Sequence, residues 1–245
     1  MLYILFAAYN EEQIMPAFMS NIKVEIEKLN IDYAVIPCTD ASTDNTAQVI
    51  AGYKSSMPII LLEQTQERGL GVAFQRTLKA VCDVSKSDDD IALFMDADCT
   101  HDLKYASPMI EKIRAGNDVV IASRFLPAST TSGFPFHRTL LSYGASIFFR
   151  ILFPIKGVKD YTSGYRAYKV SALKKAYKHY GDELIVEKNF CCLAELLIKL
   201  KKLECRFAEV PFAYDYGARV GGSKMQISKL ITATFKMSWN LLKGK

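Results

Sequence analysis

The stretch IALFMDADCTH, residues 91–101, starts with the apolar run Ile91–Met95 and continues into two carboxylates, Asp96 and Asp98. A strand without polar alternation is normally covered on both faces of its sheet. Two acids at its carboxyl end repel each other and resist removal from water. We therefore expect a buried strand that ends beside a positively charged partner.

Apolar runs of the same kind recur along the chain and alternate with helical patterns. Further strands are expected at Leu2–Ala8, Tyr33–Cys38, Ile59–Leu62 and Val119–Ser123, and helices at about Glu12–Leu29, Thr43–Tyr53, Val72–Val84 and Leu103–Ala115. Strict alternation of strand and helix predicts the α/β class, with a mostly parallel sheet flanked by helices.

The pattern changes after Phe125. Residues 126–136 are rich in Pro, Ser, Thr and Gly and are expected to form a loop. Beyond this loop we expect helices at about 138–153 and 187–202, and a strand within residues 207–214. We expect residues 1–217 to form one domain that includes the amphipathic helix 138–153. Residues 218–245 are expected to form a Gly-rich turn and a C-terminal amphipathic helix.

Composition limits the class of protein. The chain has 245 residues, of which 50% are hydrophobic and 23% charged, so it can bury a substantial core. Its formal charge of +5 is too small to indicate nucleic-acid binding, but it is compatible with an anionic ligand or membrane. The six cysteines form no CxxC pair, so we expect a reducing cytoplasm rather than disulfides or structural zinc. We also expect neither a secretory leader nor an apolar run of the roughly 18 residues that span a membrane.

Polar residues gather at the carboxyl ends of the expected strands, where such a fold places its ligands. AYNEE, CTDASTDNT and DADCTH follow the first, second and fourth strands. Asp96 and Asp98 can converge on Mg²⁺ or Mn²⁺, which take oxygen ligands and substrate phosphates. The D-x-D spacing alone could equally be a solvated turn or a helix cap. Its position at the end of a buried strand favours the metal site. Asp40 suits a nucleobase edge or ribose, and Ser42 or Thr43 suits a helix cap.

Seven motifs follow one another along essentially the whole chain: AAYNEE, DASTDNT, ERGLGVA, DAD, ASRF, DYTSGYRAY and EVPFAY…GGSK. ERGLGVA has glycines suited to close backbone approach to a phosphate, but it lacks a full G-x-G-x-x-G dinucleotide fingerprint. Together the motifs resemble the GT-A fold, family 2 glycosyltransferases, in particular the branch of dolichol-phosphate mannosyltransferases and polyprenyl-phosphate glycosyltransferases. The resemblance implies sugar transfer from a nucleotide sugar, GDP-mannose or a UDP-hexose, to a polyprenyl or dolichyl phosphate.

The resemblance also implies a role for each matching position. Nucleotide-sugar contacts would come from Ala8, Tyr9, Glu11, Asp40, Asp96, Ala97, Asp98, Arg166 and Lys224. Asp96 and Asp98 would hold Mg²⁺ or Mn²⁺. The acceptor phosphate would bind to Arg124, Arg138 and Ser142. The catalytic step would depend on Asp98, Arg124 and Arg138.

Three positions depart from the family pattern. Thr39 replaces the first acid of the DDxS pair, which bears on base recognition. Thr100 replaces the Gln often found two residues after the second metal Asp, which bears on the third metal ligand. In the RxxGxSK pattern Ala218 occupies the place of the arginine, and Arg219 comes one step late.

The implied nucleophile is a phosphate monoester, whose second pKa of about 6 leaves it largely dianionic at neutral pH. It needs no general base, but Arg124 and Arg138 would offset its repulsion from the donor. The metal would stabilise the leaving nucleoside diphosphate, and in-line displacement predicts inversion.

Two alternatives stay open. One is a hydroxyl acceptor of a cell-surface glycan, with Glu195 or Asp160 as base. The other is a non-catalytic nucleotide- or partner-binding subunit on the same fold.

Two helical segments have apolar faces. One face contains Leu140, Leu141, Gly144, Ile147, Phe148, Ile151 and Leu152, and the other Ile227, Leu230, Ile231, Phe235, Trp239 and Leu242. Lys229, Lys236 and Lys243 recur on the opposite side of the second helix. This pattern predicts helices that lie on a membrane surface without spanning it, on the cytoplasmic face. The alternative is packing on the domain core or on a membrane-embedded partner subunit.

Overall fold

The computed structural model of the protein describes residues 1–64, 69–133, 135–218 and 227–243. Seven strands form the main sheet in the order β3-β2-β1-β4-β7-β5-β8, and β6 and β9 form a separate pair. The strands are β1 (Leu2–Ala8), β2 (Tyr33–Asp40), β3 (Leu62–Gln64), β4 (Ile91–Phe94), β5 (Val119–Ser123), β6 (Thr130–Ser132), β7 (Arg166–Lys169), β8 (Phe207–Pro211) and β9 (Ala213–Asp215).

Neighbouring strands of the main sheet are parallel except at β7, which runs antiparallel to both β4 and β5. The predicted α/β class with a mostly parallel sheet is therefore confirmed. Strand β7 is not among the predicted strands, because RAYK is short and has a cation at each end. In the structure Arg166 nevertheless pairs with Phe94 and Ile121 inside the sheet.

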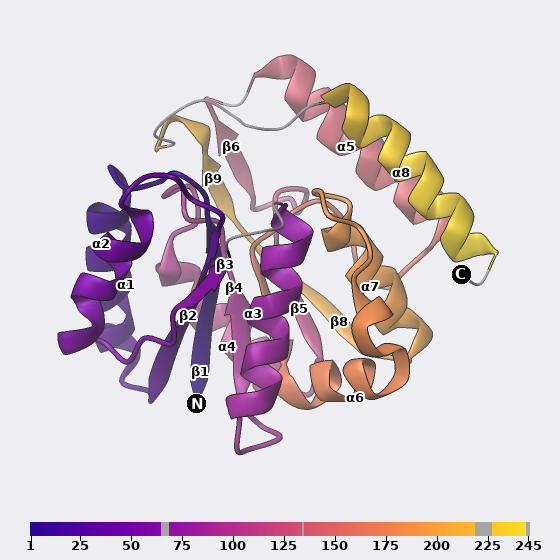
Figure 1. The fold of residues 1–245 in the computed structure, drawn as a ribbon. Helices are drawn as coiled ribbons and strands as arrows, with labels where there is room; N and C mark the ends of the chain where they lie inside the picture. The colour runs from indigo at the N-terminus through magenta and orange to yellow at the C-terminus, as the bar shows by residue number, and fades with distance from the viewer. Residues whose placement is uncertain (65–68, 134, 219–226, 244–245) are drawn as a thin grey trace.

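Helices cover both faces of the sheet (Figure 1). They are α1 (Met15–Leu29), α2 (Thr46–Gly52), α3 (Leu70–Val84), α4 (Ala106–Arg114), α5 (Phe136–Leu152), α6 (Val170–Tyr180), α7 (Cys192–Lys202) and α8 (Ile227–Leu242). Short 3₁₀ turns lie at Tyr53–Ser55, Leu103–Tyr105, Gly181–Leu184 and Tyr216–Ala218. Leu2, Ile4 and Phe6 of β1 share a core with α1 and α4, whereas Tyr3 and Leu5 share the other core with α3, α6 and α7. Each side of β1 thus meets apolar helix residues, which explains its lack of polar alternation.

Several element boundaries differ from the predicted ones. Helices α1 and α2 each begin three residues later than expected, at Met15 and Thr46. Ser42 and Thr43 do not cap α2, whose first turn has no side-chain cap at Asn45. Ser42 Oγ instead accepts a hydrogen bond from the backbone amide of Asn10 at 3.1 Å. This polar segment therefore joins the loop after β2 to the loop after β1.

The second half of the chain contains more and shorter helices and strands than expected. Helix α6 is not in the predicted set, and α7 begins at Cys192 because residues 186–190 form a loop held by Glu195. The strand expected within residues 207–214 divides into β8 and β9 at Phe212. β8 joins the main sheet and β9 pairs with β6, so this segment connects the two sheets.

Helices α5 and α8 lie side by side along one edge of the molecule (Figure 1). Their Phe148 and Phe235 rings meet at 5.2 Å, and the Cys191 sulfur before α7 lies 3.3 Å from the Thr234 hydroxyl of α8. Met237 and Leu241 of α8 are buried in the core, so part of the helix packs on the domain. Among the described residues, no helix is both long enough and apolar enough to cross a bilayer.

Candidate active site at the carboxyl ends of the strands

The loops that follow three neighbouring strands contain residues with unusual backbone geometry. Asn10 after β1, Ala41 after β2 and Cys99 after β4 have positive φ angles of 51°, 54° and 61°. Left-handed backbone at non-glycine residues costs about 1–3 kcal/mol each and is concentrated at functional sites. The carboxyl edge of β2, β1 and β4 is therefore the place to build a site.

Hydrogen bonds fasten the loop after β1 to the loop after β2. The Thr43 amide donates to Asn10 Oδ1 at 2.8 Å, and the Glu11 amide donates to Thr46 Oγ1 at 2.9 Å. The Asn45 amide donates to Glu12 Oε2 at 2.9 Å. These bonds fix the loop that holds the predicted nucleotide contacts Tyr9 and Glu11, directly after the buried Ala8.

Asp40 ends β2 and is buried. Its Oδ1 accepts from the Gln64 side chain at 3.1 Å and from the Gly69 amide at 2.9 Å, so it anchors the start of α3. A Cβ at Gly69 would lie 2.5 Å from the Lys188 carbonyl oxygen, and one at Gly71 would lie 1.8 Å from that of Glu187. The close approach that these two glycines permit is to the protein's own backbone.

Asp96 and Asp98 follow β4 in a turn braced by its own side chains. The Asp96 amide donates to His101 Nδ1 at 2.8 Å, and His101 Nε2 lies 3.7 Å from Asp96 Oδ2. The Thr100 amide donates to Asp98 Oδ1 at 3.2 Å. The Asp96 side chain is 33% exposed and borders a cavity, while Ala97 and Asp98 are buried.

The two carboxylates suit a divalent cation. Burial, together with the negative charges of Asp96 and Asp98, raises the pKa of the Tyr214 phenol to about 12, so the negative charge of both carboxylates is felt at this edge of the cavity. Within the described ranges no cluster of three or more His, Cys, Asp or Glu residues could hold a metal. Mg²⁺ and Mn²⁺ nevertheless fit two carboxylates, because Mg²⁺ usually keeps several waters and takes substrate phosphates as further ligands.

Arg124 follows β5 and forms a buried, two-bond ion pair with Asp160. Arg124 Nε and Nη2 donate to the two carboxylate oxygens at 2.8 Å each, and Nη2 also donates to Thr162 Oγ1 at 2.6 Å. Burial by itself raises the pKa of Asp160, but the Arg124 charge and several hydrogen bonds outweigh it and bring the pKa below its usual value. Thr162 Oγ1 lies 2.9 Å from the Ser142 hydroxyl of α5.

Arg138 lies in the first turn of α5, on the same cavity as Arg124 and Ser142. Its Nη1 donates to the Tyr216 hydroxyl at 3.3 Å, and its guanidinium lies 5.9 Å from the Tyr216 ring. The Arg124 guanidinium lies 5.9 Å from the Tyr214 ring. Tyr214 and Tyr216 are not among the predicted site residues. Tyr214 lies in β9 and Tyr216 begins the 3₁₀ turn that follows, and their ring centroids are 6.5 Å apart. The two-residue spacing in AYDY is the signal, because residues two apart on an extended chain face the same side.

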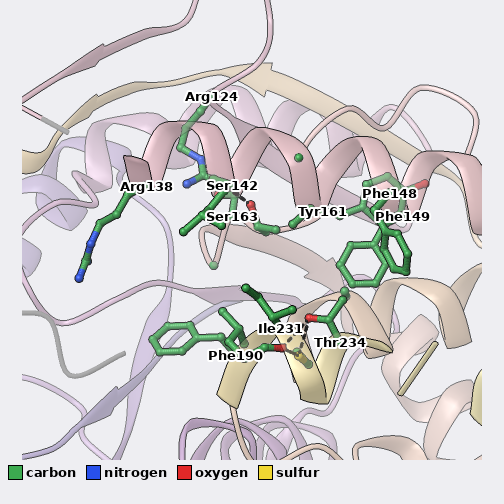
Figure 2. Close-up of a pocket in the computed structure, with 18 of the residues that line it drawn as sticks. Arg124, Arg138, Ser142, Phe148, Phe149, Tyr161, Ser163, Phe190, Ile231 and Thr234 are labelled. Atoms are coloured by element: carbon green, nitrogen blue, oxygen red, sulfur yellow. Dashed lines mark hydrogen bonds between the residues drawn. The ribbon is translucent and has the colours of Figure 1, made fainter. Parts of the chain in front are cut away.

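A cavity of about 390 Å³ joins these groups to an apolar channel. Its polar end is formed by Asp96, His101, Arg124 and Arg138. Away from them its walls come from α5, α8 and the start of α7, with Phe148, Phe190, Leu230 and Ile231. In Figure 2, Arg138, Ser142 and Phe148 of α5 lie across the cavity from Phe190 and Ile231. The structure thus brings the three predicted acceptor residues to one polar end of an apolar cavity.

Arg166 and Lys224 are the two remaining predicted contacts of the nucleotide sugar. Arg166 is fully buried, and its guanidinium donates to the backbone carbonyls of Leu193 and Tyr161, the latter at 2.8 Å. The prediction that Arg166 contacts the donor phosphates is therefore wrong, because its charge is inside the sheet and already solvated by carbonyls. Lys224 lies outside the described residues.

The candidate bases of the hydroxyl-acceptor alternative are also occupied. Glu195 is buried, pairs with Lys199 at 2.7 Å and accepts from the Val186 amide at 3.0 Å. Asp160 is fully buried beneath Arg124. Neither carboxylate borders the cavity, so neither is placed to take a proton from an acceptor there.

Comparison with known proteins identifies the family. Residues 3–176 match the family described as "Glycosyl transferase family 2". The chain belongs to glycosyltransferase family 2. This glycosyltransferase is 31% identical over 241 residues to the "Dolichol-phosphate mannosyltransferase" of Pyrococcus furiosus, covering 98% of the chain and 63% of that relative. It is 26% identical to the "Polyprenol monophosphomannose synthase" of Mycolicibacterium smegmatis, covering 97% of the chain and 86% of the relative.

Solved structures agree with the GT-A fold. The glycosyltransferase resembles glucosyl-3-phosphoglycerate synthase from Mycobacterium tuberculosis, crystallised with Mn²⁺, UDP and phosphoglyceric acid, with a TM-score of 0.66 at 19% identity. That match covers 99% of this chain and 77% of the other. A second structure of the same synthase, with Mg²⁺ and UDP, has a TM-score of 0.62 at 17% identity, covering 99% and 78%.

Proposed function

We propose that the enzyme transfers a sugar, with inversion and with the help of a divalent metal, from a nucleotide sugar to a polyprenyl phosphate. The observation that carries this proposal is the cavity that begins at Asp96, Arg124 and Arg138 and continues between α5 and α8. The cavity has a charged end and apolar walls, and a polyprenyl phosphate likewise joins a charged head to a long apolar chain. The names of the relatives from P. furiosus and M. smegmatis support this acceptor class.

The donor would lie over the carboxyl ends of β1, β2 and β4. Ala8, Tyr9, Glu11 and Asp40 would contact its nucleoside, and Ala97 its diphosphate side. Asp96 and Asp98 would hold Mg²⁺ or Mn²⁺, which would offset the charge on the departing nucleoside diphosphate. GDP-mannose and UDP-hexoses are the candidate donors. The first agrees with the relatives' names and the second with the UDP in the M. tuberculosis synthase.

The acceptor phosphate would lie between Arg138 and Arg124, near the Ser142 hydroxyl. One phosphate oxygen attacks the anomeric carbon while the bond from that carbon to the nucleoside diphosphate breaks. No proton has to be removed, because the phosphate is largely dianionic at neutral pH. The residues of the chain therefore have to position two anions. Arg138 supplies the less compensated positive charge, since Asp160 already neutralises Arg124.

Membrane association would bring the lipid to this cavity. On α8, Phe235 and Trp239 are 59% and 61% exposed, and Ile151 of α5 is 73% exposed. Apolar side chains beside Lys236 and Lys243 suit the surface of an anionic bilayer, here the cytoplasmic leaflet. A membrane-embedded partner subunit is the other occupant that such a surface could receive. Vesicle binding by the isolated chain, weakened by salt, separates the bilayer from the partner.

A donor and metal panel tests the proposal. The purified enzyme is incubated with a polyprenyl phosphate and GDP-mannose, UDP-glucose or another nucleotide sugar, with Mg²⁺, with Mn²⁺ or with excess EDTA. We expect one donor to give a lipid-phosphate sugar of inverted configuration, only when metal is present. Tight nucleotide binding without any transfer would support the non-catalytic alternative. Full activity in EDTA would remove the metal from the proposal.

A further inference from the structure

Helix α5 borders a second hollow, on the side away from the candidate acceptor cavity. This hollow of about 510 Å³ lies between the last turns of α5 and the loop at residues 154–159. Its apolar part includes Ile147, Ile151, Ile155 and Val158. Two cations, Arg150 and Lys159, complete it. The acceptor cavity uses different residues of α5, so the helix separates two distinct surfaces.

Neither cation of this hollow is neutralised within the part of the chain that the structure describes. The Arg150 and Lys159 side chains are exposed and form no ion pair or hydrogen bond with a described residue. The nearby carboxylates form no ion pair with these two described cations. Asp160 pairs with Arg124, and Glu209 Oε1 accepts the backbone amides of residues 159 and 160 at 2.8 Å each, while Glu209 Oε2 is buried. Two available positive charges beside an apolar surface favour an amphiphilic anion.

The apolar part of the hollow continues along the outer face of α5. Phe136 is 82% exposed, and Ile147 and Ile151 are 39% and 73% exposed. These positions differ by eleven and four residues, a spacing that keeps them on one side of a helix. An acyl chain lying along this stripe would bring its headgroup to the end of α5, where Arg150 and Lys159 lie.

We propose that this hollow binds the phosphate headgroup of an anionic membrane phospholipid. Arg150 and Lys159 would contact the phosphate, and Ile147 and Ile151 the first part of an acyl chain. The site is separate from the acceptor cavity and requires no sugar transfer. It shares with the proposed function only the presence of a bilayer beside α5. A headgroup held there would orient the enzyme with the exposed stripe of α5 against the membrane.

Vesicle binding with matched charge removal tests this site. The full chain and two double variants are titrated with vesicles of phosphatidylcholine alone or with phosphatidylglycerol added. One variant is Arg150→Gln with Lys159→Gln. The control is Lys54→Gln with Lys86→Gln, which removes the same charge from exposed positions near the amino ends of the strands. Thermal melting checks that each variant is folded.

We expect the Arg150/Lys159 variant to bind phosphatidylglycerol vesicles about 30-fold more weakly than the wild type, from the loss of two surface charges. The control should bind almost normally. In the wild type, the methyl NMR signals of Ile147 and Ile151 should shift with dihexanoyl phosphatidylglycerol and not with the phosphatidylcholine analogue. An equal loss of vesicle affinity in both double variants would show an effect of overall charge alone and would overturn the site. Normal vesicle binding by the Arg150/Lys159 variant would also overturn the site.

Transferase activity provides an independent readout. With a polyprenyl phosphate dispersed in neutral detergent, the Arg150/Lys159 variant should match the wild type, because the acceptor cavity is intact. If the wild type shows no transfer but retains the specific phosphatidylglycerol effect, the proposed function fails and the headgroup site remains. If transfer occurs and the vesicle effect is absent, the headgroup site fails alone.

Discussion

Replacing Asp160 with asparagine isolates the charge that holds Arg124 in place. Asp160 is fully buried and accepts from the Arg124 side chain at 2.8 Å on each oxygen and from the Ser163 amide at 3.0 Å. Asp160→Asn keeps the shape but leaves the 12% exposed Arg124 guanidinium without its counter-ion. Breaking one side of a buried pair costs about 3–5 kcal/mol, so we expect that loss in the free energy of unfolding.

Urea unfolding followed by circular dichroism measures this loss, and thermal melting provides a second value. For a chain of this size each kcal/mol lowers Tm by about 2–4 °C, so Tm should fall by about 6–20 °C. The matched control is Asp182→Asn, whose carboxylate is 87% exposed and lies 3.4 Å from Lys79. An exposed pair contributes about 0–1 kcal/mol. Similar losses in the two variants would refute the buried-pair reasoning.

The pH dependence of the free energy of unfolding tests whether the ionised form of Asp160 stabilises the fold. The pKa of Asp160 is lowered in the folded protein, because the Arg124 charge and hydrogen bonds outweigh burial. Its contribution to stability is therefore fully present above the ordinary aspartate pKa of about 3.9 and is lost as pH falls through the lower folded value. We expect the stability gap between wild type and Asp160→Asn to be constant from pH 7 to about pH 5 and to narrow below pH 4. A gap that widens in acid would contradict the assignment.

Three further variants test other parts of the site. Asp98→Asn should lower turnover by orders of magnitude with the fold intact, since an amide is a poor Mg²⁺ ligand. Asp88→Asn is its exposed control, and full activity of Asp98→Asn would remove the metal role. Arg138→Ala should raise the KM for the lipid phosphate far more than nucleotide affinity changes, whereas Arg114→Ala should change neither; the reverse pattern would place Arg138 on the donor side. Glu195→Gln should cost about 3–5 kcal/mol of stability, because it breaks the buried pair with Lys199, yet the folded enzyme should keep its turnover; a turnover loss of orders of magnitude at normal stability would restore Glu195 as a base.

The first half of the fold could be predicted because its strands are covered on both faces. Runs such as Leu2–Ala8 and Ile91–Met95 have no polar alternation, and their helices carry periodic apolar residues. Helix starts were less predictable, because the loops before α1 and α2 are fixed by bonds between Asn10 and Thr43, which are far apart in sequence. Local cap preferences cannot anticipate such long-range partners.

The same limit applies to the site. The resemblance places Arg124, Arg138 and Ser142 at the acceptor, and the structure brings them to one cavity. It cannot show that Arg124 pairs with Asp160, which lies 36 residues later. Nor can a motif reveal the direction of a side chain. Arg166 belongs to DYTSGYRAY, but β7 turns it into the protein interior toward the Leu193 carbonyl of α7.

The most direct test compares two acceptors that differ only in the phosphate. The enzyme is given one active nucleotide sugar and equal amounts of a polyprenyl phosphate or the matching free polyprenol, in the same detergent. A site built to bind a polar group rejects an analogue that lacks it by about 10⁴-fold, so kcat/KM for the polyprenol should be lower by that order. Arg138→Ala should narrow the difference by losing activity only with the phosphate. Comparable transfer to the free polyprenol hydroxyl would contradict the account.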